Sequence, residues 1–366
     1  MAIFPITELK PGMKVVSDVH TSLGALLLQK GKVLLPRDLD ILRAFMIQQV
    51  EVEGKQGKVE KNYSSTKDTG NSSRLNPQTT GSSSELASAS LLHQEYDRML
   101  LLIKSAFQSV LATELPIYEL RHQLEALIKQ LSHYKVLTFT PRNINEYDYL
   151  YHNAILSSLT SYLLAKWHGL PQKDWMQVAF AGLLHDIGNT KIDTAILYNP
   201  NPLSAAEVEE MRMHTTYGYQ LLRKVTAVNE GVRLTALQHH EKMDGTGYPF
   251  NLTEDKIHIY ARIVAIADIF HAMTLNRRYR KAKSPYLVLE QIKSEAFGKL
   301  DPGVVQTFIE KVTQFHNGMR VRLSNDNVGE IVFTDRNHPT RPMISVKGQI
   351  INLTQDPKLY IEEVLT

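Results

Sequence analysis

Seven histidine and aspartate residues are candidates for chemistry because several of them interrupt segments that are otherwise apolar. His185 and Asp186 follow two leucines and precede an isoleucine, and Asp268 lies inside the run R-I-V-A-I-A-D-I-F. Burying such groups costs free energy unless they are paired or bind a metal. One helical histidine alone is more often a satisfied core residue, but the recurrence of the pattern favours one shared site. The set is His152, His185, Asp186, His214, His239, His240 and Asp268.

The ligand atoms in this set are imidazole nitrogens and carboxylate oxygens, and the chain has no cysteine. Such ligands suit iron, manganese, zinc or nickel, whereas an iron–sulfur cluster and a thiolate site are excluded. Seven ligands are too many for one tetrahedral structural site, but they suit two metals that share a carboxylate. Such a pair activates water and neutralises charge on phosphoryl oxygens. The adjacent His239 and His240 would point about 100° apart on a helix and so serve two positions of one centre.

The overall composition is that of an ordinary globular protein. The chain has 366 residues, of which 43% are hydrophobic and 22% charged, and this length suggests two or three domains. A formal net charge of +3 demands neither a nucleic-acid polymer nor a membrane surface as partner. The start M-A-I-F-P-I-T-E-L-K lacks the pattern of a secretory signal, and no apolar run of about 18 residues predicts a transmembrane helix. With the absence of cysteine, this favours a cytoplasmic protein.

The N-terminal quarter of the chain contains two segments of different composition. Residues 1–54 contain short apolar runs separated by Pro-Gly and Gly, followed by a helical pattern over 36–50, and predict a small α+β module. Residues 55–90 are rich in Ser, Thr, Gly and Asn and have little to bury, so we expect a flexible linker.

Helical periodicity dominates the rest of the chain, so the predicted fold class is mainly α, a helical bundle. Residues 91–139 are interpreted as connecting helices, which either complete the bundle or form a dimer interface. Residues 140–316 hold all seven candidate ligands and are the predicted catalytic domain. Residues 317–366 alternate apolar and polar positions between turn residues, which predicts a small β module of four or five strands.

Several motifs in the helical region resemble those of the HD-GYP domain, a branch of the HD metal-dependent phosphohydrolases. They are H-D at 185–186, H-H-E-K-M-D-G-T-G-Y-P at 239–249, D-I-F at 268–270, and N-P-N-P-L-S-A-A-E before His214. The last of these ends in an S-x-x-E helix-capping box. The resemblance implies an HD-type helical bundle that holds two or three divalent metals, iron or manganese. It also implies hydrolysis of the bacterial messenger cyclic di-GMP to linear pGpG and sometimes to GMP.

The resemblance assigns roles to individual residues. The seven candidates would be metal ligands, with Asp186 bridging two metals. Some family members hold a third metal with an acid four residues before the first ligand histidine, and Asp148 occupies that place, one helical turn from His152. The alternative for Asp148 is an exposed or N-capping acid.

The resemblance also implies substrate-binding residues in two segments. Gly247, Tyr248 and Pro249 belong to the loop that names the family, where Tyr248 would either lie against the ligand or brace the loop. Arg277 and Arg280, in the basic run R-R-Y-R-K-A-K, would meet substrate phosphates, to which a guanidinium group is well suited. Solvation at a helix end is the alternative for the lysines of this run.

The sequence departs from the family pattern at several positions. Asn189 replaces the lysine of H-D-x-x-K, which is expected to contact substrate phosphate. Lys191, two residues on, could reach the same region, but a helix would turn it away. We therefore count Asn189 and Lys191, with Asp186, as candidate catalytic residues. His271 replaces the second acid of D-x-x-D, and Arg278 replaces the proline of R-P-Y-R.

Three functions follow as expectations. The first is a metal-dependent phosphodiesterase with cyclic di-GMP as its partner, and with a homodimer or signalling proteins as further partners. The second is a cyclic dinucleotide receptor or scaffold that keeps the metal site but turns over poorly. The third, a purely structural bundle, explains neither the seven ligands nor the Gly-Tyr-Pro loop.

Overall fold

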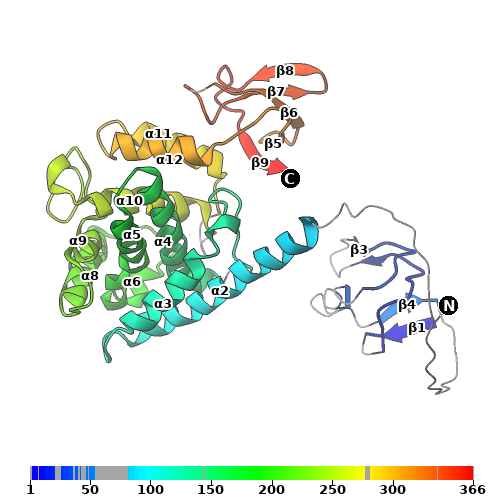
Figure 1. Ribbon diagram of the computed structural model, residues 1–366, viewed down its shortest axis with the longest axis horizontal. Helices are drawn as coiled ribbons and strands as arrows, with labels where there is room; N and C mark the ends of the chain where they lie inside the picture. The colour runs from blue at the N-terminus through cyan, green and yellow to red at the C-terminus, as the bar shows by residue number, and fades with distance from the viewer. Residues whose placement is uncertain are drawn as a thin grey trace, which may run out of the picture. The chain divides into compact units, whose positions relative to one another are not determined.

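The computed structural model describes most of the chain. The described residues are 2–6, 8–20, 26–35, 38–39, 42, 47, 49–53, 81–142, 145–276, 281–335 and 337–365. The chain divides into two compact units, Met1–Asn76 and Pro77–Thr366. Figure 1 labels most of the helices and strands of the two units.

The first unit contains two small antiparallel sheets. Strand β1 (Ala2–Pro5) pairs with β4 (Gln49–Val52), and β2 (Val19–His20) pairs with β3 (Leu26–Leu28). Short apolar stretches supply a separate core that includes Val15, Leu34 and Val52. The strands agree with the expected module. The helix expected over 36–50 falls mostly outside the described residues, as does most of the expected linker, but Gln49 and Val50 at its expected end belong to strand β4.

The second unit is a helical bundle, which confirms the predicted fold class. Its helices are α2 (Gly81–Ser109), α3 (Ile117–Ile128), α4 (Tyr149–Trp167), α5 (Gln172–Leu184), α6 (Thr194–Leu197), α7 (Ala205–Arg212), α8 (His214–Arg223), α9 (Glu230–Gln238), α10 (Ile259–Thr274), α11 (Pro285–Glu295) and α12 (Pro302–Val312). The short 3₁₀ helix η3 (Ile187–Lys191) follows α5. Helix α2 begins at Gly81, so residues 81–90, which the composition placed in the linker, are helical.

The helices of the second unit share one hydrophobic core, and α4 and α10 lie at its centre. Both are buried on nearly every face, as expected for helices surrounded by others, although α4 also buries several polar side chains. Helices α2 and α3 contribute Tyr96, Ile103 and Leu124 to the same core, so they complete the bundle. The capping box predicted at Ser204 and Glu207 is present at the start of α7. Within the described part of the chain, no helix has the length and apolar character needed to cross a membrane.

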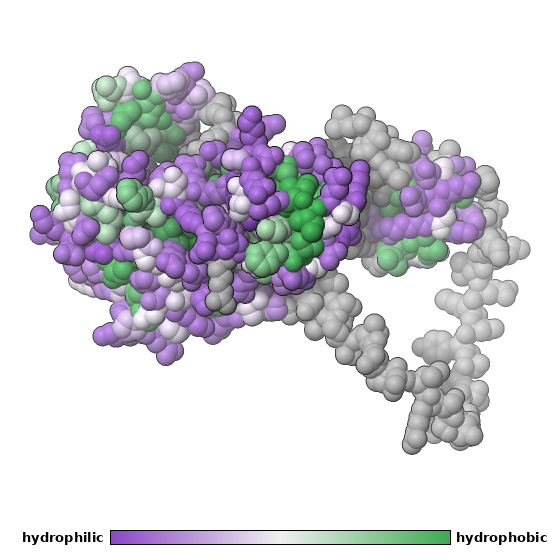
Figure 2. All heavy atoms as spheres, turned by 90° about the horizontal axis from the view of Figure 1, so that it is seen from above, coloured by the Kyte–Doolittle hydropathy of each residue, from purple (hydrophilic) through white to green (hydrophobic). Residues whose placement is uncertain are grey.

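A five-stranded antiparallel sheet follows the bundle, as the sequence predicted. Its strands are β5 (Arg320–Leu323), β6 (Val328–Phe333), β7 (Met343–Val346), β8 (Gln349–Asn352) and β9 (Ile361–Leu365), in the order β8-β7-β6-β5-β9. Tyr286 of α11 packs into the core of this sheet. Most of the surface seen in Figure 2 is hydrophilic, with compact hydrophobic areas between the polar ones.

Candidate metal centre

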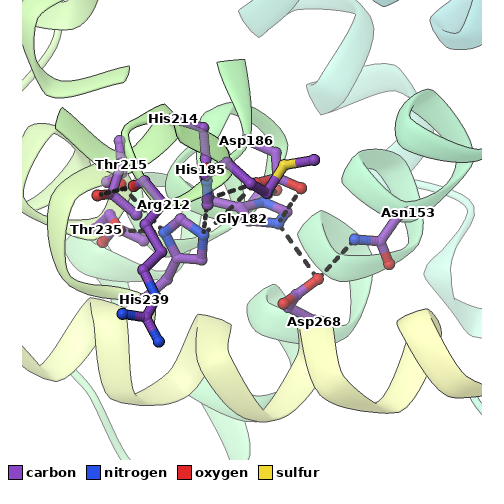
Figure 3. Close-up of polar contacts among 12 residues, drawn as sticks. Asn153, Gly182, His185, Asp186, Arg212, His214, Thr215, Thr235, His239 and Asp268 are labelled. Atoms are coloured by element: carbon purple, nitrogen blue, oxygen red, sulfur yellow. Dashed lines mark hydrogen bonds and ion pairs between the residues drawn. The ribbon is translucent and has the colours of Figure 1, made fainter. Parts of the chain in front are cut away.

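Asp186 lies at the centre of the predicted ligands and faces them with both carboxylate oxygens. Its Oδ1 is 3.4 Å from Nε2 of His214 and 3.5 Å from Nε2 of His239. Its Oδ2 is 3.5 Å from Nε2 of His185, and that nitrogen is 3.4 Å from Oδ1 of Asp268. Figure 3 shows these side chains converging from different helices. One carboxylate therefore joins two sets of ligands.

The two sets each bring their ligand atoms within 4.8 Å of one another. The first consists of Asp186, His214, His239 and His240, and the second of His185, Asp186 and Asp268. Six of the seven predicted ligands thus form one cluster.

Helix ends supply most of this cluster. His185 is the residue that ends α5, Asp186 begins η3, His214 begins α8, and His239 ends α9. Asp268 alone lies in mid-helix, where Asn153 of α4 donates a hydrogen bond of 2.6 Å from Nδ2 to its Oδ1. These side chains depend on the packing of the whole bundle, because they come from five different elements.

Three of the imidazoles are oriented by the backbone. Nδ1 of His185 donates to the carbonyl of Gly182 at 2.7 Å, and Nδ1 of His214 donates to that of Met211 at 2.6 Å. Nδ1 of His239 donates to Thr235 at 3.0 Å. A carbonyl only accepts, so the proton must sit on Nδ1. In the neutral ring the lone pair then sits on Nε2, which is the arrangement expected of metal-ligating histidines.

The distance between two imidazole nitrogens also indicates that this group of side chains binds a cation. The Nε2 atoms of His214 and His239 lie 3.3 Å apart, although both rings already use Nδ1 as donor. Two lone pairs at that distance repel each other unless a proton or a cation lies between them. Imidazole with carboxylate is a donor set that first-row divalent metals accept, and it contains no sulfur.

Burial and mutual charge control protonation in the cluster. Burial alone would lower the pKa of His185, but Asp186 and Asp268 raise it to about 9. Burial would raise the pKa of Asp186, but the neighbouring histidines, His185 first, hold it well below its usual range. Burial lowers the pKa of His240 well below its ordinary value. The carboxylates therefore stay ionised, and His240 stays neutral and able to act as a ligand.

His152 and Asp148 lie at the start of α4, and each contacts α2. Nδ1 of His152 is 2.9 Å from the hydroxyl of Tyr96, whose ring stacks on the imidazole. Oδ1 of Asp148 forms an ion pair of 2.6 Å with Nζ of Lys104. Neither is among the residues whose ligand atoms cluster around Asp186. Their roles as ligands stay predictions.

Gly188 allows η3 to pack directly on α8. A Cβ at this position would lie 1.8 Å from the carbonyl oxygen of His214 and 2.5 Å from the amide nitrogen of Gly218. No side chain fits there, so glycine fixes the distance between the segment that carries Asp186 and the helix that carries His214.

The Gly-Tyr-Pro loop folds back onto the residues after His240. A Cβ on Gly247 would lie 2.3 Å from the amide nitrogen of Lys242, so only glycine permits this approach. The buried carboxylate of Glu241 accepts hydrogen bonds from the amides of Phe250, at 2.7 Å, and Leu252, at 2.9 Å. Glu241 therefore anchors the loop exit beyond Pro249.

Tyr248 contacts both a ligand and a cation. Its ring stacks on His240 with ring centroids 4.8 Å apart, and the guanidinium carbon of Arg212 lies 5.2 Å from the centre of the same Tyr248 ring. Burial, with Asp186 and Asp268 nearby, raises the pKa of Tyr248 well above its ordinary value, so the phenol keeps its proton at neutral pH. Tyr248 braces His240 and also lines the adjoining cavity.

A cavity of about 670 Å³ opens onto the cluster, a volume typical of small-molecule sites. Its lining includes Asp186, His214, His240, Tyr248, Asp268 and the predicted catalytic Asn189. Asn189 is buried, and within the described residues its Oδ1 has no hydrogen-bond partner.

Lys191 lies elsewhere. It lines a different cavity, of about 1140 Å³, and its Nζ is 5.2 Å from the centre of the Tyr217 ring. In a 3₁₀ helix residues are about 120° apart, so a side chain two positions beyond Asn189 points to another face. The structure therefore does not bring Lys191 to the cluster, contrary to its choice as a candidate catalytic residue.

Two further predictions concern α10 and the segment after it. Arg277 and Arg280 fall outside the described residues. His271 is buried, with Nε2 2.7 Å from Oγ1 of Thr160, and burial lowers its pKa to about 3. It is a neutral core residue of α10 rather than a third carboxylate at the centre.

A helical bundle in which one carboxylate lies between two sets of imidazole and carboxylate groups is typical of domains that bind divalent metals. The family can be named from comparison: a family model described as an HD domain matches residues 124–304. This part of the chain is an HD domain. The match begins inside α3, earlier than the domain start expected at residue 140.

Three curated relatives each match about half of this chain or somewhat less. The chain is 32% identical over 188 residues to a cyclic di-GMP phosphodiesterase of Pseudomonas aeruginosa, covering 51% of this chain and 45% of that protein. It is 33% identical over 190 residues to a cyclic di-GMP phosphodiesterase of Thermotoga maritima, covering 50% of each. It is 33% identical over 153 residues to a 3′3′-cGAMP-specific phosphodiesterase of Vibrio cholerae, covering 42% of this chain and 29% of that one. The chain thus spans half or less of each relative.

Sequence reasoning missed several residues that support the site. Glu241 lies inside a quoted motif, and its position beside two ligands was the available signal. Asn153 follows His152 directly. Tyr96 and Lys104 lie far along the chain from the residues they contact, His152 and Asp148. Their own helix has no local pattern that indicates a role in the site.

Proposed function

We propose that the HD domain is a metal-dependent phosphodiesterase that hydrolyses cyclic di-GMP to linear pGpG, and then in part to GMP. The observation that carries the proposal is Asp186, whose two oxygens face two sets of ligands beside a cavity of about 670 Å³. The names of the relatives from Pseudomonas aeruginosa and Thermotoga maritima support this substrate.

The residues divide the work as follows. Asp186 with His185 and Asp268 would hold one divalent metal, and Asp186 with His214, His239 and His240 a second. When bound, the metals supply Lewis acidity, which activates water and neutralises phosphoryl charge. We propose iron or manganese, with His152 as a further ligand and Asp148 as the acid of a third site.

The chain itself orients the reactants. Backbone carbonyls hold the imidazoles in one tautomer, and Asn153 fixes the orientation of Asp268. Tyr248 and Asn189 form part of the cavity in which a phosphodiester would lie. The reaction adds one water across a phosphorus–O3′ bond, with the phosphorus gaining the hydroxyl oxygen and the departing 3′ oxygen gaining a proton.

A second candidate function is a cyclic dinucleotide receptor with little turnover. Asn189 favours it, because this uncharged residue lines the cavity where the family is expected to place a phosphate-binding lysine. The receptor would keep the metal centre and the cavity but stabilise the transition state less.

The deciding experiment compares turnover and binding in one preparation. The full chain would be loaded with manganese or ferrous iron, its metal content measured, and cyclic di-GMP and 3′3′-cGAMP each added with product analysis by chromatography. Linear pGpG supports the phosphodiesterase. Binding by calorimetry without product, at full metal loading, supports the receptor, and neither binding nor product overturns both.

The location and the partners of the protein are also part of this proposal. We propose a cytoplasmic protein that acts on a free nucleotide, not on a nucleic-acid polymer or a membrane, and that acts as a homodimer or with signalling partners. Regulatory roles are proposed for 1–54 and 317–366. Their deletion with no change in activity or oligomeric state would count against those roles.

A further inference from the structure

The HD-domain cavity contains a cation, Lys242, that lies inside the H-H-E-K-M-D-G-T-G-Y-P motif but received no role from the sequence analysis. Lys242 follows the ligand pair by two positions and lines the same cavity as Asp186, Asn189 and Asp268. Among the described residues that line this cavity, it is the only lysine or arginine. Within the same part of the chain, its Nζ takes part in no ion pair and no hydrogen bond, although the charges of Glu295 and Asp268 act on it.

Other cations near the centre already have partners. Arg212 pairs with Glu209 at 2.7 Å and covers the ring of Tyr248. Lys104 pairs with Asp148 at 2.6 Å. Lys191 lines the separate cavity described above. Of the lysines and arginines just compared, Lys242 is therefore the one whose charge remains available to a ligand in the cavity.

The backbone at Lys242 is held firmly. Gly247 packs against its amide nitrogen so closely that a Cβ would lie 2.3 Å away, and its carbonyl accepts a hydrogen bond of 2.9 Å from the amide of Gly245. Glu241, directly before it, anchors the loop exit. A side chain that starts from a fixed backbone is better pre-organised to meet a ligand group.

We propose that Lys242 meets a phosphate of the bound nucleotide and supplies the cation that Asn189 does not. The inference rests on the proposed function, because it names the residue that would bind the phosphodiester in that site. An ammonium group is a suitable partner for a phosphate oxygen, and one beside the metal ligands would oppose the charge that builds up on the phosphoryl group. The two positions belong to different segments, 189 in η3 and 242 after α9, but they line one cavity.

The test uses four variants of the full, metal-loaded chain. Lys242→Met removes the charge, Lys242→Arg keeps it, and Asn189→Lys in the Lys242→Met background returns a cation from the other segment. Lys299→Met is the matched control. This exposed lysine interacts electrostatically with Lys242, but it does not line the cavity. Metal content, kcat, KM and the Kd for cyclic di-GMP would be measured for each.

The expected result is that Lys242→Met lowers kcat/KM and weakens cyclic di-GMP binding by about 10- to 100-fold at unchanged metal content. Lys242→Arg and the double variant should recover at least part of the loss, and Lys299→Met should match the wild type. A Lys242→Met variant within twofold of the wild type overturns the proposal, and so does a loss that follows metal content or that Lys242→Arg does not relieve.

Failure of the proposed function is distinguishable from failure of this inference. If the wild type neither binds nor cleaves cyclic di-GMP, the proposed function fails. Inorganic phosphate is then the probe, titrated into metal-loaded wild type and Lys242→Met. Weaker phosphate binding in the variant would support Lys242 as the phosphate-binding cation, and equal binding would overturn that role.

Discussion

Nε2 of His214 and Nε2 of His239 lie 3.3 Å apart, and both rings donate Nδ1–H to backbone carbonyls. This contact is stable only if something positive lies between the two nitrogens. The same pair faces Oδ1 of Asp186. The arrangement is the one that two ligands of a common metal would need, and we propose that His214 and His239 bind one metal.

The first prediction follows from this contact. His239→Ala should remove one ligand of the set, lower the bound metal by about one equivalent, and reduce kcat for cyclic di-GMP by about 100-fold or more. Metal analysis and a turnover assay on the same sample measure both. The exposed His316→Ala is the control and should leave metal and activity unchanged. Full metal content in His239→Ala would contradict the assignment.

The second prediction concerns Gly188. Gly188→Ala would place a methyl group 1.8 Å from the carbonyl oxygen of His214, so η3 and α8 must separate. We expect a loss of about 3 kcal/mol in stability together with weaker metal binding, measured by thermal unfolding and metal titration. Gly303→Ala is the control, since its Cβ would have no neighbour nearer than 3.5 Å. Equal behaviour of the two variants would rule out the close packing as the cause.

The third prediction concerns the ion pair between Lys104 and Asp148. Lys104→Met removes the partner 2.6 Å from Oδ1 of Asp148 and leaves this acid one helical turn from His152. If Asp148 is the acid of a third metal site, the variant should bind that metal more tightly than the wild type. Lys104→Arg retains the charge and is the control. Unchanged metal affinity and stoichiometry would mean that Asp148 serves only at the start of α4.

The fourth prediction is a pH dependence of stability from His271. Burial lowers the pKa of His271 from 6.5 to about 3. Between these two pH values the unfolded chain binds a proton at this residue and the folded chain does not. The neutral ring thus contributes stability above pH 6.5 that is lost as pH falls towards 3, about 1.4 kcal/mol per pH unit.

His271→Leu tests this contribution, because leucine does not titrate. Tyr134 and Thr160 keep their mutual contact of 3.0 Å in the variant. Between pH 7 and pH 5 the wild type should lose on the order of 5 °C more in Tm than the variant. His316→Leu, the control, should follow the wild type. An equal acid loss in His271→Leu and wild type would show that another group is responsible.

The sequence predicted the bundle, the terminal sheet and six clustered ligands because each rests on a local pattern. His185, Asp186 and Asp268 interrupt apolar runs, and the strands of the C-terminal module alternate apolar and polar residues. The sequence could not predict contacts between residues that are far apart along the chain. Tyr96 reaches His152 across 56 positions, and nothing in its own helix marks it.

Side-chain direction was the second limit. Lys191 is near Asn189 in sequence, but the 3₁₀ geometry of η3 turns it to another cavity, whereas Lys242 reaches the cavity of Asn189 from a segment after α9. The two-residue spacing already indicated that a helix would turn Lys191 away from Asn189, and η3 does so. The path of the loop after α9, which brings Lys242 to the cavity, does not follow from spacing.

The bridging position of Asp186 is the central claim, and metal counting tests it most directly. Wild type and Asp186→Asn would be loaded with manganese, freed of excess metal and analysed for metal per chain, with cyclic di-GMP turnover measured on the same samples. The account predicts at least two metals and linear pGpG for the wild type, and at most one metal and no measurable product for Asp186→Asn. Equal metal content and equal turnover in the two proteins would contradict it.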